Sequence, residues 1–250
     1  MDSRPNLSGV TLVAVTSVAI EPTVRALDAC MKQADFGHVL LLSDQPLPGI
    51  AGDKIEWRRI ERLASRGDYS RFMLHKLAGE IGTSHALCIQ WDGFILDGAN
   101  WNPAFLDYDY IGAPWPHFRD GHNVGNGGFS LRSRRLLDAC AGLPFEVRHA
   151  EDIVISRLCR PLLEQQGLRF APESLARQFA YERSRPSGRE FGFHGAFNLV
   201  RHLSARDALV LFRSLDPALL AKNERWELLR WAILRGRARL AATMARRLMS

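Results

Sequence analysis

The 250-residue sequence predicts an α/β fold, in which helices flank a mixed, mostly parallel central sheet. The length and the 46% hydrophobic content are sufficient to build a substantial core. The first 115 residues alternate apolar, β-branched runs with segments whose apolar residues have helical spacing. The charge is divided between a nearly neutral body, residues 1–200, and a basic C-terminal segment, residues 201–250, which we expect to be a separate helical extension.

The apolar runs define the expected strands, which cover residues 10–16, 38–42, 54–60 and 84–91. One connecting helix is expected to begin near Pro22 and another to cover residues 69–81. Residues 98–130 are rich in glycine, asparagine, proline and aromatic residues, which predicts long surface loops. Further helices are expected from Ser133, over 151–166 and over 173–182.

Charge and composition exclude several classes of protein. Residues 201–250 contain 11 of the 33 Lys/Arg residues and 4 of the 27 Asp/Glu residues, which gives this segment a net charge of +7. Residues 1–200 contain the remaining 22 Lys/Arg and 23 Asp/Glu residues, a net charge of −1. The body therefore lacks the basic electrostatic field that suits nucleic-acid binding. The four cysteines lack metal-ligand spacing and predict reduced, buried thiols of a cytosolic protein. Neither a membrane span nor a signal peptide is expected from the apolar pattern.

The ends of the expected strands mark candidate ligand-binding positions, because ligands of parallel sheets gather beyond the carboxyl ends of the strands. Three places qualify: Thr16-Ser17, Ser43-Asp44 and the segment 90–93. In the last of these, the Asp92 carboxylate is suited to a divalent cation that neutralises a diphosphate. The alternative is an ordinary turn aspartate before Gly93.

Three later segments also combine residue types that are useful for chemistry. Gly127 and Gly128 allow positive φ and close approach of the backbone to a ligand, or they form an ordinary hairpin turn. Glu151 and Asp152 open a helix, where a carboxylate serves either as a structural cap or as a base. His194 lies in a glycine-rich stretch and is either a structural histidine or a residue that reaches a cleft or a metal.

In this order, the motifs resemble the inverting nucleotide-sugar glycosyltransferases of the GT-A fold, and specifically a bacterial family of glycosyltransferase-like domains. The resemblance covers roughly residues 9–200. It rests on YSRFMLHKL (69–77), IQWDGFIL (89–96), DYDYIGAPWP (107–116), VGNGGFSLRSRRLL (124–137), EDIVISR (151–157) and FGFHG (191–195).

The resemblance implies how the donor would be bound. A segment matching residues 90–92 binds the donor diphosphate and a divalent cation, Mn²⁺ or Mg²⁺, although Gln90 stands where the family has its first aspartate. The implied metal ligands are Asp92 and His194, which we therefore expect to lie close together. The remaining donor-binding residues implied are Thr16, Ser17, Arg71, Lys76, Gln90 and Trp91.

The resemblance also implies the catalytic residues. Asp152 would deprotonate the acceptor hydroxyl, and Glu151 would position the acceptor or the neighbouring loop. Substrate would contact Trp115, Asn126, Gly127 and Gly128. Aromatic platforms for a sugar face would come from Trp91, Trp101, Trp115 and Phe129, for each of which core packing is the alternative.

The function implied is transfer of a sugar, with inversion, from a nucleotide-sugar donor such as a UDP-sugar to a glycan or lipid-linked acceptor in bacterial surface polysaccharide synthesis. The implied location is the cytoplasm, at the inner face of the cell membrane. The alternative is a non-catalytic relative that binds a sugar nucleotide or a glycan. A third class, nucleic-acid binding through the basic tail, is disfavoured because no nucleic-acid motif is present.

The C-terminal segment has its own pattern. Ser204 and Asp207 resemble a capping box. A basic amphipathic helix over 223–250 would carry one apolar face, formed by Trp226, Leu229, Ile233, Leu240 and Met244. Such a face suits peripheral membrane contact, or packing against the domain or a second subunit in a homodimer.

Overall fold

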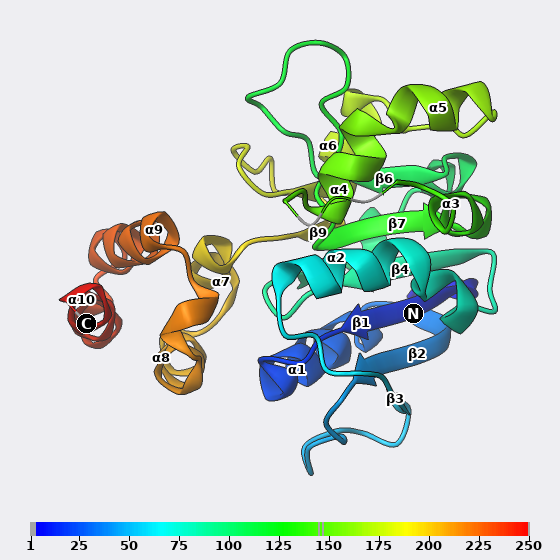
Figure 1. Cartoon of the computed structure of the whole chain (residues 1–250). Helices are drawn as coiled ribbons and strands as arrows, with labels where there is room; N and C mark the ends of the chain where they lie inside the picture. The colour runs from blue at the N-terminus through cyan, green and yellow to red at the C-terminus, as the bar shows by residue number, and fades with distance from the viewer. Residues whose placement is uncertain (1–3, 145, 147, 250) are drawn as a thin grey trace. The chain divides into compact units, whose positions relative to one another are not determined.

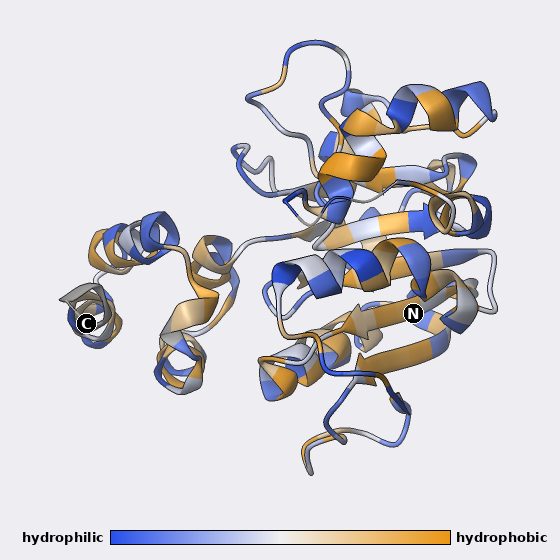
Figure 2. Cartoon of the chain, viewed as in Figure 1, coloured by the Kyte–Doolittle hydropathy of each residue, from blue (hydrophilic) through white to orange (hydrophobic). Residues whose placement is uncertain are grey.

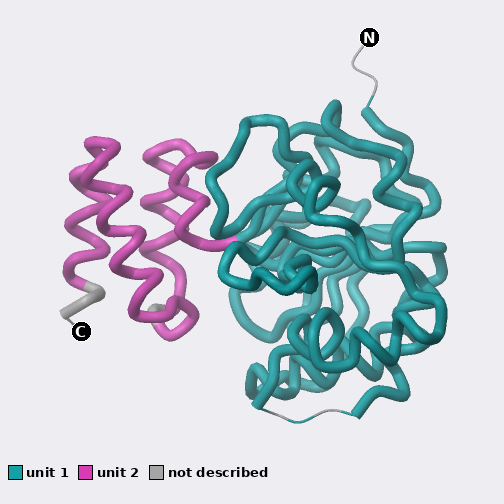
Figure 3. The backbone as a smooth tube through the Cα atoms, turned by 90° about the horizontal axis from the view of Figure 1, so that it is seen from above, with its two compact units in different colours: residues 1–194 teal, residues 195–250 magenta. Residues whose placement is uncertain are grey.

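The computed structural model describes residues 4–144, 146 and 148–249, which form two compact units. The boundary lies between His194 and Gly195 (Figure 3), rather than at the expected residue 200. Residue 200 falls inside α7 (Ala196–His202), which packs on α9 (Lys222–Leu234) and therefore belongs to the C-terminal unit.

The N-terminal unit is built on a mixed sheet with the strand order β3-β2-β1-β4-β7-β6 (Figure 1). The strands β1, β2, β3 and β4 are parallel, and β7 is antiparallel to both of its neighbours. The expected mixed, mostly parallel sheet flanked by helices is confirmed. Its strands are β1 (Asn6–Val15), β2 (Asp35–Ser43), β3 (Glu56–Arg59), β4 (His85–Ile89), β6 (Tyr110–Gly112) and β7 (Phe129–Ser133).

The central strands are apolar on both faces, because helices cover both faces (Figure 2). Along β1, Leu12 and Ala14 enter the core shared with α1 (Ile20–Met31). The alternate residues Val13 and Val15 enter the core shared with α2 (Arg66–His75). The four cysteines are buried and free, as the sequence predicts.

The remaining helices of this unit depart from the expected ranges at identifiable positions. The expected helix 69–81 is α2 followed by a 3₁₀ turn, because Lys76 leaves helical geometry at φ −119°. The expected helix 151–166 is interrupted by a π-helical turn, and Pro161 lacks the N–H that would continue the helical bonding. The elements are η1 (Leu77–Glu80), α3 (Arg134–Cys140), α4 (Glu151–Ile153), η4 (Val154–Leu158), α5 (Arg160–Gln165) and α6 (Glu173–Phe179).

Residues 98–130 are not surface loop throughout, and that expectation is wrong for β6. Tyr110 and Ile111 are fully buried in this strand at the sheet edge. The last residue of the strand, Gly112, has no room for a side chain, because a Cβ there would lie 1.9 Å from the carbonyl oxygen of Gly125. Two 3₁₀ turns precede it, η2 (Gly98–Asn100) and η3 (Pro103–Asp107).

A second, small sheet has the strand order β5-β9-β8. Its strands are short: β5 (Phe94–Ile95), β8 (Ala180–Tyr181) and β9 (Gly192–Phe193). β9 pairs antiparallel with β5 and parallel with β8. β5 is thereby held beside a segment about a hundred residues later in the chain.

The C-terminal unit contains α7, α8 (Ala205–Ser214), η5 (Pro217–Leu219), α9 and α10 (Ala238–Met249). The expected cap is confirmed, since the Ser204 hydroxyl accepts a hydrogen bond from the Asp207 N–H at 3.1 Å. The expected single helix over 223–250 is wrong. α9 ends before Gly236, whose φ of +65° is left-handed, and α10 begins after it.

This break separates the expected apolar face. Leu240 and Met244 are buried, whereas Trp226 and Ile233 are 56% and 62% exposed. Among the described residues, no helix is both long and apolar enough to cross a membrane.

Candidate active site

The candidate site lies at the edge of the main sheet where β1, β2 and β4 end. Because β7 is antiparallel to β4, the loop that precedes β7 lies at the same edge. The backbone N–H of Gln90, just after β4, donates to the carbonyl of Gly128 at 2.9 Å. The segment 90–93 and the glycine loop, defined here as residues 126–128, therefore meet.

The small sheet brings His194 to the same place. Phe94 of β5 pairs with Phe193 of β9, so the residues next to these strands become neighbours. Asp92 Oδ1 lies 3.3 Å from His194 Nε2. The expected proximity of Asp92 and His194 is confirmed, and its structural cause is the pairing of β5 with β9.

Glu182 completes this cluster on the other side of the imidazole. It follows β8, which pairs with β9, and its Oε1 lies 3.5 Å from His194 Nδ1. Burial opposes the charged imidazole, but the carboxylates of Asp92 and Glu182 raise the pKa of His194 well above its ordinary value. The imidazole is thus held between two carboxylates in a largely buried position.

Gln90 contacts the same ring nitrogen as Asp92. Its Oε1 lies 3.3 Å from His194 Nε2, and its Nε2 donates to the Tyr69 hydroxyl at 3.0 Å. In this orientation the amide nitrogen faces Tyr69 and the amide oxygen faces the histidine.

These donors are of the type that a divalent cation accepts. Asp92 and Gln90 contribute oxygen, His194 contributes nitrogen, and Asp92 Oδ1 is a buried atom. Within the described part of the chain, no group of three His, Cys, Asp or Glu side chains is arranged to hold a metal. A cation at this cluster would displace the proton that the two carboxylates favour on His194, because only a neutral imidazole is a ligand, and it would need further ligands from a substrate.

The glycine loop is packed tightly between protein side chains. A Cβ on Gly127 would lie 2.1 Å from Glu151 Oε1, and a Cβ on Gly128 would lie 2.0 Å from His194 Nε2. The expected positive φ is found instead at Asn126, at 67°. The Asn126 Oδ1 accepts from the Gly128 N–H at 3.1 Å, which stabilises this turn. The close approach that requires glycine is thus to Glu151 and His194.

Glu151 is a buried supporting residue of this loop. Its Oε1 accepts from Nη2 of Arg132 at 3.1 Å, and the Arg132 side chain is fully buried. Arg132 also donates to the Gly127 carbonyl at 3.4 Å and to the Ser130 hydroxyl at 3.0 Å. Of the two roles expected for Glu151, this geometry fits positioning of the loop, because the carboxylate is occupied by Arg132.

Asp152 points toward the same loop from a half-buried position. Its Oδ2 accepts from the Gly127 N–H at 2.9 Å, and its Oδ1 accepts from the Ile153 N–H at 2.8 Å. Burial and the neighbouring charge of Glu151 raise the pKa of Asp152 to about 6, against the opposite effect of these hydrogen bonds. The carboxylate is therefore ionised at neutral pH and becomes neutral in mild acid.

The other expected donor-binding residues are placed in different ways. Thr16 and Ser17 are buried at the end of β1, where Ser17 Oγ accepts from the Leu63 N–H at 2.9 Å. Arg71 is exposed and pairs with Asp68. Lys76 follows α2 by one residue, about 10 Å along the helix axis from Tyr69. The structure therefore does not bring Lys76 to the strand ends.

The aromatic residues serve mainly as core. Trp115 is 6% exposed and packs on Phe118, and a Cβ on Gly125 would lie 2.1 Å from its ring. Phe129 is fully buried, and Trp101 packs edge-on against Phe191. For Trp115 and Phe129 the core alternative is correct. Trp101 is half-buried and packs against the core, and Trp91 is also half-buried.

The sequence interpretation missed Tyr69, Arg132 and Glu182 as parts of the site. Tyr69 and Arg132 lie inside motifs that were singled out, but neither has a local pattern that indicates its partner. Glu182 lies at the end of an expected helix that instead becomes β8.

Comparisons with known proteins give the following results. A family model described as "Protein of unknown function (DUF5672)" matches residues 54–194, a range that includes Gln90, Asp92, the glycine loop, Asp152 and His194. A search of curated proteins finds no match. Among solved structures, the chain is similar to the mannosyltransferase PcManGT from Pyrobaculum calidifontis in complex with GDP-Man and Mn²⁺. The identity is 12% and the TM-score 0.44, over 99% of this chain and 75% of that chain.

Proposed function

The chain belongs to the DUF5672 family of proteins of unknown function, and we propose that it is a glycosyltransferase that uses a nucleotide-sugar donor. One observation carries this proposal. Consecutive residues of the glycine loop contact the two kinds of group that such a transfer requires. Gly127 donates to Asp152, a candidate base, and Gly128 packs on His194 of the candidate cation cluster.

This spacing suits an inverting displacement. Adjacent Cα atoms are about 3.8 Å apart, so Asp152 and His194 contact neighbouring positions of one loop. Inversion needs the base on the face of the sugar opposite to the departing phosphate. In the proposed arrangement, the leaving diphosphate lies toward Asp92 and His194, and the acceptor hydroxyl lies toward Asp152.

Asp152 takes the proton of the acceptor hydroxyl as that oxygen attacks the anomeric carbon. A sugar hydroxyl is a weak nucleophile and needs a carboxylate within hydrogen-bond reach. A pKa of about 6 keeps Asp152 ionised at neutral pH while making it more basic than an ordinary aspartate. Glu151 and Arg132 hold the loop against which Asp152 is oriented.

Asp92, Gln90 and His194 are the residues that would hold Mn²⁺ or Mg²⁺. The cation, when bound, would neutralise the charge that develops on the departing diphosphate. Because Gln90 adds no negative charge, we expect weak cation binding to the protein alone and stronger binding once donor phosphates are present. Calorimetric titration of Mn²⁺ with and without UDP tests this, and tight binding to the protein alone would contradict it.

The nucleotide, the sugar and the acceptor follow only from the sequence resemblance: a UDP-sugar, a glycan or lipid-linked hydroxyl, and bacterial surface polysaccharide. A non-catalytic sugar-nucleotide binder is the competing function, favoured by the glutamine at position 90 and by the backbone hydrogen bonds that already occupy Asp152.

A panel of nucleotide sugars, with and without Mn²⁺, separates these functions. A bound ligand at 100 times its Kd should stabilise the fold by about 2.7 kcal/mol in a thermal-shift experiment. Release of nucleoside diphosphate that depends on an acceptor and is lost in Asp152→Asn supports the transferase. Stabilisation without any turnover supports the binding protein.

We further propose that α9 contacts an anionic membrane surface. Its exposed side chains include Trp226, Ile233 and Leu234, at 56%, 62% and 65% exposure. The exposed charged residues on and next to this helix are Lys222, Arg230 and Arg235. The acidic residues of α9, Glu224 and Glu227, are half-buried. Exposed tryptophan and aliphatic residues beside cations are suited to an interface with anionic lipid.

A further inference from the structure

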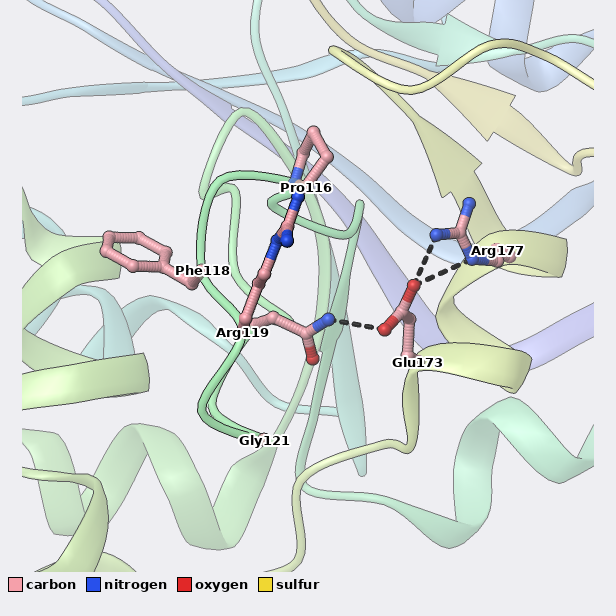
Figure 4. Close-up of a pocket in the computed structure, with 7 residues that line it drawn as sticks. Pro116, Phe118, Arg119, Gly121, Glu173 and Arg177 are labelled. Atoms are coloured by element: carbon pink, nitrogen blue, oxygen red, sulfur yellow. Dashed lines mark hydrogen bonds and ion pairs between the residues drawn. The ribbon is translucent and has the colours of Figure 1, made fainter.

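A pocket of about 330 Å³ lies between α6 and the loop that joins β6 to β7 (Figure 4). None of the site residues expected from the sequence lines it. We infer that this pocket binds an acidic sugar unit of the acceptor, whose carboxylate or phosphate pairs with Arg119. The identification of the ligand as part of an acceptor rests on the proposed glycosyltransferase function. The binding experiment that tests the pocket does not.

One wall of the pocket is a fixed set of polar groups. Glu173 Oε2 accepts from Asn123 Nδ2 at 2.5 Å, and Glu173 Oε1 accepts from Arg177 Nε at 2.8 Å. The dashed lines in Figure 4 mark these interactions: the bond from Asn123 joins the loop to α6, and the bond from Arg177 lies within α6. Both Glu173 oxygens are therefore engaged, and Asn123 and Arg177 keep remaining N–H groups for a ligand. These N–H groups can donate hydrogen bonds to sugar hydroxyls.

Arg119 supplies the uncompensated positive charge. Within the described residues, its guanidinium makes no hydrogen bond or ion pair, although it lines the pocket. The neighbouring Asp120 does not neutralise it, because Asp120 is bound by Arg157 at 2.6 and 3.1 Å. The pocket thus holds two arginines and one glutamate, an excess of one positive charge that matches a single anionic group.

The pocket loop is held by η4, the helical turn that directly follows the proposed base. Arg157, one turn beyond Asp152, lies 3.6 Å over the Phe118 ring and donates to the His122 carbonyl at 2.6 Å. The Trp115 N–H donates to the Asn123 carbonyl at 2.7 Å and closes the base of the loop. The shape of the pocket is therefore fixed by backbone bonds and by Arg157 before any ligand enters.

The pocket is also within reach of the reacting centre. Asn123 precedes Gly127 by four residues, which span at most about 14 Å. Gly127 donates to Asp152. A short oligosaccharide is therefore long enough to place its acidic unit in the pocket and a hydroxyl near Asp152.

The test measures binding in the absence of any nucleotide sugar. D-glucuronate, glucose 6-phosphate, glucose and inorganic phosphate are titrated into the full chain by ligand-observed NMR. We expect an acidic sugar to bind more tightly than both glucose and inorganic phosphate. Glucuronate as the tighter ligand indicates a carboxylate-bearing unit, and glucose 6-phosphate indicates a phosphorylated one.

The variant Arg119→Gln should weaken acidic-sugar binding about 10- to 100-fold, since it removes a charge-assisted hydrogen bond. Arg206→Gln, the same change at an exposed position of the C-terminal unit, should leave binding unchanged. Equal binding of glucose, equal binding of inorganic phosphate, or no effect of Arg119→Gln would each overturn the inference. Because no donor is present, a failure of the proposed transfer reaction would appear only in the turnover assay.

Discussion

The two compact units differ in how their most distinctive charged and apolar side chains are placed. In the N-terminal unit, Arg132 is fully buried beside Glu151, and His194 is held between two carboxylates. In the C-terminal unit, Trp226 and Ile233 are exposed among arginines, and residues 201–250 carry a net charge of +7.

This difference is consistent with the division of work that we propose. Burying an ion costs free energy that its partner offsets only with good geometry, so the buried pairs of the N-terminal unit are best explained by positioning of groups for chemistry. Exposed apolar side chains beside cations cost solubility and are best explained by contact with a surface. Changes in the first unit should therefore affect turnover or folding, and changes in the second should affect vesicle binding.

The largest effect is expected from Asp152→Asn. Loss of a general base lowers turnover roughly 100- to 10,000-fold, while donor affinity stays nearly constant. Turnover and donor affinity are measured together, and Asp138→Asn, an exposed position paired with Arg134, is the matched control. Wild-type turnover in Asp152→Asn, or a product that keeps the donor's anomeric configuration, would exclude the mechanism.

Glu151→Gln should chiefly reduce stability. The change leaves the buried Arg132 without its charged partner, which costs about 3–5 kcal/mol in the free energy of unfolding. Glu21→Gln breaks an exposed pair with Arg25 and should cost less than about 1 kcal/mol. Urea unfolding compares the two variants. If Glu151→Gln is as stable as Glu21→Gln and only weakens acceptor binding, the direct acceptor contact is the correct role.

The pH dependence of turnover should show the titration of Asp152. Below about pH 6 the carboxylate is protonated, so turnover at saturating substrates should fall about tenfold per pH unit. The same titration should change the free energy of unfolding in the opposite direction. Because the pKa of Asp152 is higher in the folded state than in the unfolded state, protonation of Asp152 stabilises the fold at pH values below the unfolded-state pKa. This stabilisation is lost as the pH rises through about 6. A turnover profile that stays flat from pH 7 to pH 5 would contradict the assignment.

The smallest effect tests the C-terminal unit. Arg230→Gln should weaken binding to vesicles that contain anionic lipid about fivefold, the equivalent of about 1 kcal/mol for one cation at the surface. Arg206→Gln, on α8, should change binding less, and turnover on a water-soluble acceptor should be unaffected by either variant. Equal binding to neutral and anionic vesicles would remove the membrane proposal and leave the α9 surface to another partner.

The structure agrees with the sequence interpretation where the signal is local, and differs where a contact is distant. The cap at Ser204 and the strands of the parallel sheet follow from spacing over a few residues. The expected apolar face over 223–250 failed because a single left-handed glycine, Gly236, ends the helix. Trp115 was offered as a sugar platform, but composition alone does not distinguish an exposed ring from one packed near Gly125.

By itself, the sequence determined the layered α/β architecture, the separation of charge between the body and the tail, and the sheet edge at which the residues of the candidate site gather. These depend on periodicity and on the direction of parallel strands, which are properties of short segments. Only the tertiary structure decided that Glu182 joins Asp92 and His194, and that Glu151 is occupied by Arg132. The physical reason is that strands as short as β5, β8 and β9 carry no periodic signal, and the partner of a buried charge is set by packing between elements distant in the chain.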